Sequence, residues 1–111
     1  MKQEIAERWV QALRSGKYKQ GRGVLKQDES FCCLGVLCDI TKDELELEWI
    51  PDPDSDSLDG GLLVLPLSVM DYAGLSARNP AVGVKTLSDM NDAGVKFNRI
   101  AKLIEKHWEE L

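Results

Sequence analysis

One segment of this sequence constrains the fold more than any other. The nine residues from Cys32 to Ile40 are almost wholly apolar, so they belong in a protein interior. A run of this length fits a buried strand or a buried helix. Cys33 lies four residues before Leu37, the spacing of neighbours on one helix face. We therefore predict a buried helix at about 33–42, in which Gly35 costs about 1 kcal/mol relative to Ala.

Apolar residues also recur at helical spacing near both ends of the chain. Ile5, Trp9 and Leu13 are four residues apart with charged residues between them, which is typical of an amphipathic helix. Ser15-Gly16 is expected to end this helix. A second series runs from Phe97 to Leu111 with Lys, Arg and Glu on the other face. We expect these two helices to be the main contributors to the core.

Short β segments are expected between the helices. Gly23 to Leu25 and Phe31 bracket a polar segment at 26–30, which predicts a β-hairpin. Glu46 to Ile50 alternates polar and apolar residues like a half-buried strand. Leu62 to Leu65 is the predicted partner of that strand.

The segment 51–61 is too rich in Pro, Asp and Gly for a helix or a strand, and we expect a mobile acidic hairpin loop. Asp52, Asp54 and Asp56 alternate as at the start of an EF-hand calcium loop. The sixth position of that loop needs glycine for a sharp turn and is Ser57 here. We therefore expect a solvated acidic loop, with weak calcium binding as the alternative.

Two shorter helices complete the predicted order. Pro66 suits a first helical turn and Gly74 suits a C-terminal stop, so a helix of about two turns fits between them. Thr86 or Ser88 is expected to cap a brief helix, and the residues at 91–94 read as a turn.

These elements predict an α+β fold. At 111 residues the chain suffices for one hydrophobic core, so we expect a single small domain over 1–111. The expected architecture is mostly helical, with short antiparallel β-hairpins and packed N- and C-terminal helices.

Charge and hydropathy narrow the classes of partner. The formal net charge of −5 repels polyanions, which argues against nucleic-acid binding. No apolar run approaches the length of a membrane span, and the charged start is unlike a secretory signal. We therefore expect no membrane partner and a cytoplasmic location.

The cysteines favour a structural role over a chemical one. Cys32, Cys33 and Cys38 are an odd number of thiols, so we expect buried, reduced side chains. His107 is the sole histidine and lies far along the chain, which argues against a zinc site and a hydrolytic triad. The sequence lacks a nucleophile–base pair, so we expect a non-enzymatic protein with no cofactor and no metal.

The best functional candidate is the basic, glycine-containing segment after the first helix. Lys17, Arg22 and Arg14 are cations that could bind phosphates, helped by backbone amides that glycine leaves free. Tyr18 could stack on a base. The alternative is a solvated turn without a ligand.

Two further groups of residues allow a functional and a structural interpretation. Asn91 and Asp92 could present an amide and a carboxylate to ribose hydroxyls, or could serve only in a turn before the last helix. Trp9, Trp49 and Trp108 are expected in the core or in a contact between copies of the chain, so a homo-oligomer is a further expectation.

Much of the chain resembles a family of small uncharacterised proteins of bacteriophages and prophages. The resemblance rests on Leu13 to Gly23, Phe31 to Asp39, Leu87, Asn91-Asp92, Gly94, Phe97, Ile100-Ala101 and Ile104-Glu105. It implies a viral accessory protein in the host cytoplasm and brings no settled activity. Small acidic accessory phage proteins often counter host defence, which is an association with the family and not a deduction from residues.

Two functions therefore compete. In the first, the protein binds and sequesters a small nucleotide-like signalling molecule through Arg14, Lys17, Tyr18, Arg22 and Asn91 or Asp92. In the alternative, its acidic surface inhibits a host protein through the loop at 52–59.

Overall fold

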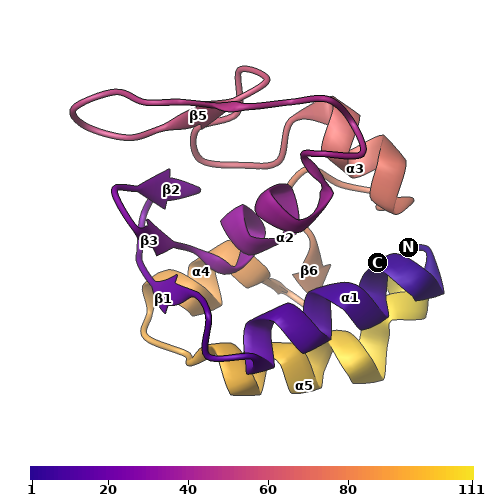
Figure 1. Ribbon diagram of the computed structural model, residues 1–111. Coiled ribbons are helices and arrows are strands. Elements are labelled where there is room, and N and C mark those ends of the chain that lie inside the picture. Colours follow the sequence, from indigo (N-terminus) through magenta and orange to yellow (C-terminus); the bar gives the residue numbers. More distant parts are fainter.

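The computed structural model describes all residues from 1 to 111 and arranges them in layers (Figure 1). Helices from the two ends of the chain lie side by side in one layer, and long loops with a short helix form the opposite one. The helices are α1 (Gln3–Arg14), α2 (Cys33–Thr41), α3 (Leu67–Ala73), α4 (Leu87–Asp92), α5 (Phe97–His107) and the 3-10 helix η1 (Trp108–Glu110). The strands are β1 (Lys19–Gln20), β2 (Lys26–Gln27), β3 (Ser30–Phe31), β4 (Trp49–Ile50), β5 (Ser57–Leu58), β6 (Ala81–Val82) and β7 (Lys85–Thr86).

The two terminal helices form as the spacing of apolar residues predicts. In α1 the series from Ile5 to Leu13 is buried, and in α5 Phe97 and Ile104 face the same core. The indole nitrogen of Trp9 donates to the backbone oxygen of Cys33 at 2.9 Å, which fixes α1 on α2. The last helix is shorter than predicted, because its final turn tightens into η1.

Helix α2 is the buried helix that the apolar run predicts. It lies between the terminal helices and the upper loops (Figure 1), and its three cysteines are free and buried. Gly35 also has a packing role that was not predicted from the sequence. A Cβ atom at this position would overlap the carbonyl oxygen of Leu25, so only glycine lets the hairpin backbone lie directly on the helix.

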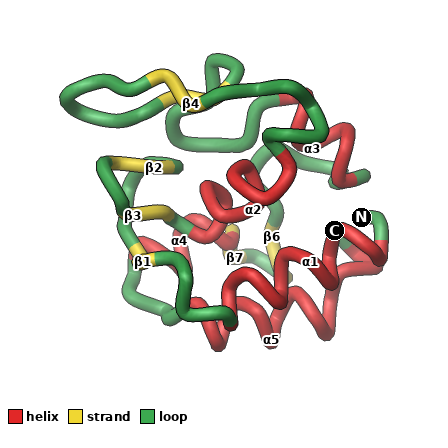
Figure 2. Tube along the Cα trace, in the orientation of Figure 1, coloured by secondary structure: helices red, strands yellow, loops and turns green.

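The strands are short, and loops make up most of the upper part of the molecule (Figure 2). A hairpin forms in the predicted region, because β2 pairs antiparallel with β3. Its first strand lies at Lys26–Gln27, within the polar segment that was expected to connect the two arms. The parallel pairing of β1 with β3 was not predicted.

The predicted partner of the 46–50 strand is wrong. Strand β4 pairs with β5, so that Trp49 lies opposite Leu58. Leu58 is fully buried, whereas Leu62 is exposed, so burial favours Leu58 as the partner. The backbone of Leu65 instead exchanges hydrogen bonds with Arg78.

The acidic segment is also more ordered than predicted. Asp56 is buried, and its Oδ2 lies 2.5 Å from Nζ of Lys26. Its backbone nitrogen donates to the oxygen of Lys26 at 2.9 Å. A buried, paired carboxylate and the buried Leu58 attach this segment to the core, and only part of it is a solvated acidic loop.

The two short helices lie close to their predicted positions. Gly74 ends α3 in the left-handed conformation with φ of 72°, and the side chain of Thr86 caps α4. Asn91 and Asp92 belong to the last turn of α4, so the predicted turn begins only after them.

The fold is thus a small α+β domain with one core of 24 buried apolar residues. The two ends of the chain meet, since the α-amino group of Met1 donates to the backbone oxygen of Trp108 at 3.3 Å. None of the helices combines the length and the apolar character that crossing a membrane requires.

Candidate functional site

The predicted site residues divide among three places around the C-terminal end of α1. Arg14 is the last residue of this helix, and Lys17 is exposed in the segment that follows. Gly16 has a φ of 77°, which turns the chain out of the helix.

Asn91 is brought to the glycine-containing segment, as the sequence suggests, but in a buried position. Its Oδ1 accepts hydrogen bonds from Nε2 of Gln20 at 2.9 Å and from the backbone nitrogen of Cys33 at 3.2 Å. Its Nδ2 donates to the oxygen of Gly21 at 2.8 Å. The amide is fully buried and occupied by these three partners, so its evident role is to hold the segment in place.

Asp92 and Arg22 lie beside this anchor. Oδ1 of Asp92 accepts a hydrogen bond from the backbone nitrogen of Gly23 at 2.8 Å, which removes one of the amides expected to be free. The guanidinium of Arg22 lies against the turn after α4, where Nη2 is 3.2 Å from the place of a Cβ on Gly94. Arg22 is exposed and stays available to a ligand.

Tyr18 is held from two sides. Its hydroxyl donates to Oδ2 of Asp39 at 2.6 Å, and its ring meets Phe31 edge to face, with the ring centroids 5.0 Å apart. Burial, followed by the neighbouring Asp39 carboxylate, raises the pKa of Tyr18 well above its ordinary value. Oδ1 of the same carboxylate accepts from Nε1 of Trp49 at 2.9 Å, so Asp39 joins two aromatic side chains.

Lys17 and Tyr18 line one depression of about 600 Å³ at the ends of α1 and α2. Its charges are mixed, since Arg8 and Lys42 contribute to it together with the acidic Asp39. Mixed charge of this kind gives no preference for an anion.

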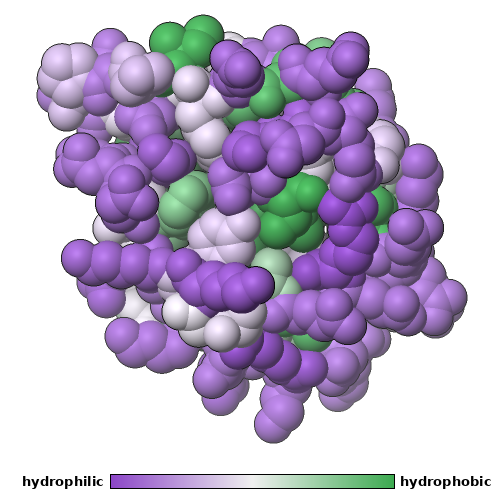
Figure 3. Space-filling view, in the orientation of Figure 1, coloured by the Kyte–Doolittle hydropathy of each residue, from purple (hydrophilic) through white to green (hydrophobic).

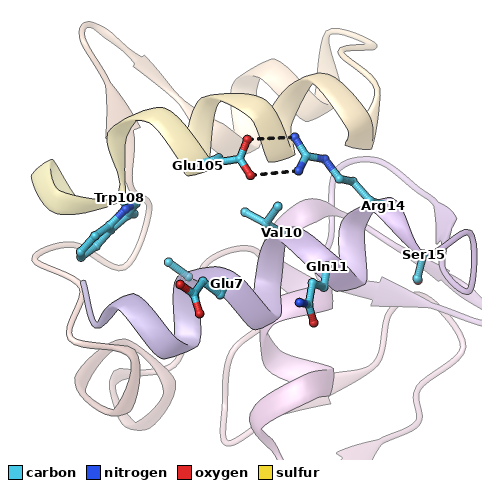
Figure 4. Close-up of a pocket in the computed structure, with 8 residues that line it drawn as sticks. Glu7, Val10, Gln11, Arg14, Ser15, Glu105 and Trp108 are labelled. Atoms are coloured by element: carbon cyan, nitrogen blue, oxygen red, sulfur yellow. Dashed lines mark hydrogen bonds and ion pairs between the residues drawn. The ribbon is translucent and has the colours of Figure 1, made fainter.

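A second hollow is a groove of about 500 Å³ between α1 and α5. Ala6 and Val10 provide apolar lining, and the half-buried Trp108 lies toward one end (Figure 4). Arg14 reaches from α1 to Glu105 on α5 with two hydrogen bonds of 3.1 and 3.3 Å.

A third hollow of about 370 Å³ adjoins the groove at Arg14, which lines both. Its other lining residues are Asn98, Arg99 and Lys102, so it contains three cations and no carboxylate. The hydrogen bond from Arg14, with the charge of Lys102 as a smaller cause, lowers the pKa of Glu105. This basic depression is the most cationic hollow among the three at this end of α1.

The α5 residues of this depression were not predicted from the sequence. Arg99 and Lys102 are three residues apart and share a helix face, but they look like any solvated face. Only the packing of α5 on α1 places them beside Arg14.

The remaining chemical groups have structural explanations. The cysteines are buried as predicted, and burial raises the pKa of Cys33 and Cys38 well above the ordinary value. No three His, Cys, Asp or Glu side chains are arranged to hold a metal ion.

Comparison with known proteins identifies the family and no function. Residues 1–108 match the model of a family described as a domain of unknown function (DUF8296). The chain belongs to this family. No curated protein and no solved structure matches the chain.

Proposed function

We propose that this protein is a non-enzymatic binding protein for a small nucleotide-like anion, and that it acts by sequestering that molecule. The observation that carries the proposal is the basic depression at Arg14, Arg99 and Lys102, which shares Arg14 with the groove between α1 and α5.

The depression supplies the binding energy for phosphate. Three cations converge there although the chain as a whole carries a charge of −5. Arginine can donate two parallel hydrogen bonds to a phosphate, and lysine adds a point charge. Phosphate binding draws Arg14 partly away from Glu105, an exchange that costs little because exposed ion pairs contribute at most about 1 kcal/mol.

The groove supplies a place for the base and the sugar. Trp108 offers an aromatic ring, and Ala6 and Val10 offer apolar contact, as a nucleobase requires (Figure 4). Glu7 and Gln11 line the same groove with groups that can bond to ribose hydroxyls and to a base edge. Glu7 and Arg14 lie seven residues apart on α1, about 10 Å of helix, which gives one ligand room for both ends.

The proposal changes the roles expected from the sequence. Arg14 binds the ligand directly, while Asn91 and Asp92 hold the neighbouring segment. Lys17 and Arg22 add positive charge near the site. Tyr18 holds the glycine-containing segment against α2 through Asp39 and against β3 through Phe31.

A role against host defence belongs to the same proposal. It is supported by the resemblance to phage and prophage proteins, and a binder without catalysis fits removal of a signalling molecule from the host cytoplasm. We propose that removal of this signalling molecule is the reason why the protein binds its ligand tightly.

Native mass spectrometry of the purified protein tests the proposal first. The protein is mixed with deproteinised extracts of bacteria in which nucleotide-signalling defences are active, and separately with inorganic pyrophosphate, ATP and a cyclic dinucleotide. We expect an adduct of several hundred daltons, which titration calorimetry then quantifies.

Matched variants locate the site. We expect Arg99→Gln with Lys102→Gln to weaken binding at least tenfold, because two phosphate contacts are lost. The control, Lys85→Gln with Lys106→Gln, makes the same change of charge at exposed positions outside the depression and retains affinity. A second pair, Lys17→Ala with Arg22→Ala, tests the site expected from the sequence, and loss of binding only there moves the ligand away from the groove. Absence of any adduct rejects the function itself.

A further inference from the structure

We propose that a second surface, at β4 and β5, binds a basic amphipathic segment of another protein. We define the β4–β5 face as the lining of two hollows, of about 580 and 450 Å³, that share Ile50. This inference is independent of the proposed anion site, which lies at the opposite layer of the molecule (Figure 1).

Charge on the β4–β5 face is of one sign. Six carboxylates line the two hollows, and no lysine or arginine does. The carboxylates are Asp43, Glu46, Glu48, Asp52, Asp54 and Asp59. Such a surface attracts cationic partners and repels nucleic acids and anionic membranes.

Exposed apolar side chains accompany this charge. Ile50 is 62% exposed and Leu62 is 45% exposed, and they line the same hollow. Leu63 and Leu67, in the same stretch of chain, are 60% and 57% exposed. The one other large exposed apolar residue is Val84, on a distant turn. Figure 3 shows hydrophobic side chains at the surface of the part of the molecule that carries β4 and β5. Apolar groups inside a charged rim are typical of a protein-binding surface.

The face is held rigidly although it consists largely of loops. The buried pair of Lys26 and Asp56 attaches its centre to the β2–β3 hairpin. Nζ of Lys26 also lies 5.9 Å from the ring centroid of Trp49, the residue before Ile50. At the other side, Oγ of Ser68 donates to Oδ2 of Asp59 at 2.6 Å. A surface ordered before binding loses little conformational entropy when a partner docks.

The chemistry of the partner follows from these two features. Its leucine- or isoleucine-like side chains would cover Ile50 and Leu62, and its lysines or arginines would lie over the carboxylates. A helix with apolar residues every three or four positions presents both groups on adjacent faces. We therefore choose a basic amphipathic segment as the occupant. A second copy of this chain, docking through its own basic depression, would form a head-to-tail contact, which builds a ring or an open filament.

Titration calorimetry with a designed peptide tests this proposal. The probe is a helical peptide of lysine and leucine with leucine at helical spacing, and its control has the same composition in a scrambled order. We expect binding of the first peptide, at least tenfold weaker binding of the scrambled one, and a further loss at high salt.

Matched variants separate the two contributions. Ile50→Ser with Leu62→Ser is expected to weaken binding at least tenfold, whereas Val84→Ser, at a fully exposed apolar position outside the β4–β5 face, has no effect. Glu46→Gln with Glu48→Gln is expected to weaken binding about threefold or more, a change of the size that loss of surface ion pairs gives. The control Glu4→Gln with Glu109→Gln, which removes the same charge from the other layer, leaves affinity unchanged.

Four results would overturn the proposal. Equal affinity for the scrambled peptide, or equal loss with the distant charge variant, would show attraction by net charge alone. Unchanged affinity in the Ile50 and Leu62 variant would remove the apolar contribution. Concentration-dependent association in sedimentation that the same variant abolishes would identify the occupant as a second copy of the chain. The peptide results are independent of anion binding at Arg99 and Lys102, because the two sites share no lining residue.

Discussion

Asn91 joins three parts of the chain that are far apart in sequence. Its one side chain bonds to the backbone of Gly21, to the side chain of Gln20 and to the first turn of α2 at Cys33. Asn91→Ala leaves these buried groups without partners, so we expect the free energy of unfolding to fall by about 3 kcal/mol. Urea denaturation measures this change. Asn98→Ala, at an exposed position, is the control and should stay within about 0.5 kcal/mol of the parent protein.

The same residue shows how far residue types alone can predict a site. The sequence pairs Asn91 and Asp92 with the glycine-containing segment, and the structure does bring them together. An asparagine amide serves a ribose hydroxyl or a backbone carbonyl equally well, so its type does not distinguish a ligand site from an anchor. Burial decides between them, and burial depends on the packing of α4, which a single sequence does not reveal.

Helix α2 and the chain before the β2–β3 hairpin are in contact through backbone atoms at Gly35 and Leu25. Gly35→Ala would raise helix propensity by about 1 kcal/mol, yet its methyl group collides with a carbonyl oxygen. We expect a net destabilisation of about 3 kcal/mol or more, because neither backbone can move without disturbing the core. Thermal unfolding followed by circular dichroism checks this. Glu7→Ala compared with Glu7→Gly, at an exposed position of α1, measures propensity alone, and a stabilised Gly35→Ala variant would contradict the packing.

The helices could be predicted from the sequence, whereas the pairing of β4 with β5 could not, and the reason is physical. Helices α1 and α5 contain apolar residues at helical spacing over about three turns, and α2 is an almost wholly apolar run. Each can therefore be predicted as a helix even where single residues depart from the pattern. Strands β4 and β5 have two residues each and leave no alternation to detect. Leu58 is surrounded in sequence by Asp, Ser and Gly, and its burial against Trp49 is fixed by the core as a whole.

A network of three side chains ties the layers of the molecule together. Arg8 on α1 pairs with Glu44 at 2.5 Å, and Glu44 also accepts a hydrogen bond from Tyr72 on α3. The hydrogen bond from Arg8, then the one from Tyr72, lowers the pKa of Glu44 below its ordinary value of 4.5. A lowered pKa in the folded state means that this stabilisation is fully present above about pH 4.5 and is lost as the pH falls through the folded value.

We therefore expect Glu44→Gln to reduce the dependence of stability on pH in the acid range. Urea denaturation between about pH 3 and pH 7 should give a shallower decline than in the parent protein. Glu48→Gln, which removes an exposed carboxylate from the β4–β5 face, is the control for the loss of one negative charge. A parallel shift of the whole curve without a change of slope would show that the pair does not titrate with folding.

The proposed anion site depends on the packing of the two ends of the chain against each other. Arg14 and Lys102 come from opposite ends of the sequence, and only the packing of α1 on α5 makes them neighbours. Arg14 could be predicted from the sequence because it belongs to a local basic segment. Lys102, Arg99 and the groove at Trp108 required the folded molecule, since charges on a solvated helix face look alike until a second helix lies beside them.

The burial of Cys32, Cys33 and Cys38 makes the rate of thiol labelling a measure of how often the core opens. A thiol-reactive dye modifies thiolates, and these thiols are shielded in the folded core with raised pKa values. Labelling therefore proceeds only when α2 opens, and its rate counts opening events under native conditions. A ligand that binds in the α1–α5 groove, or a peptide that docks on the β4–β5 face, would lower the rate of cysteine labelling. Its binding could then be detected without a label on the ligand.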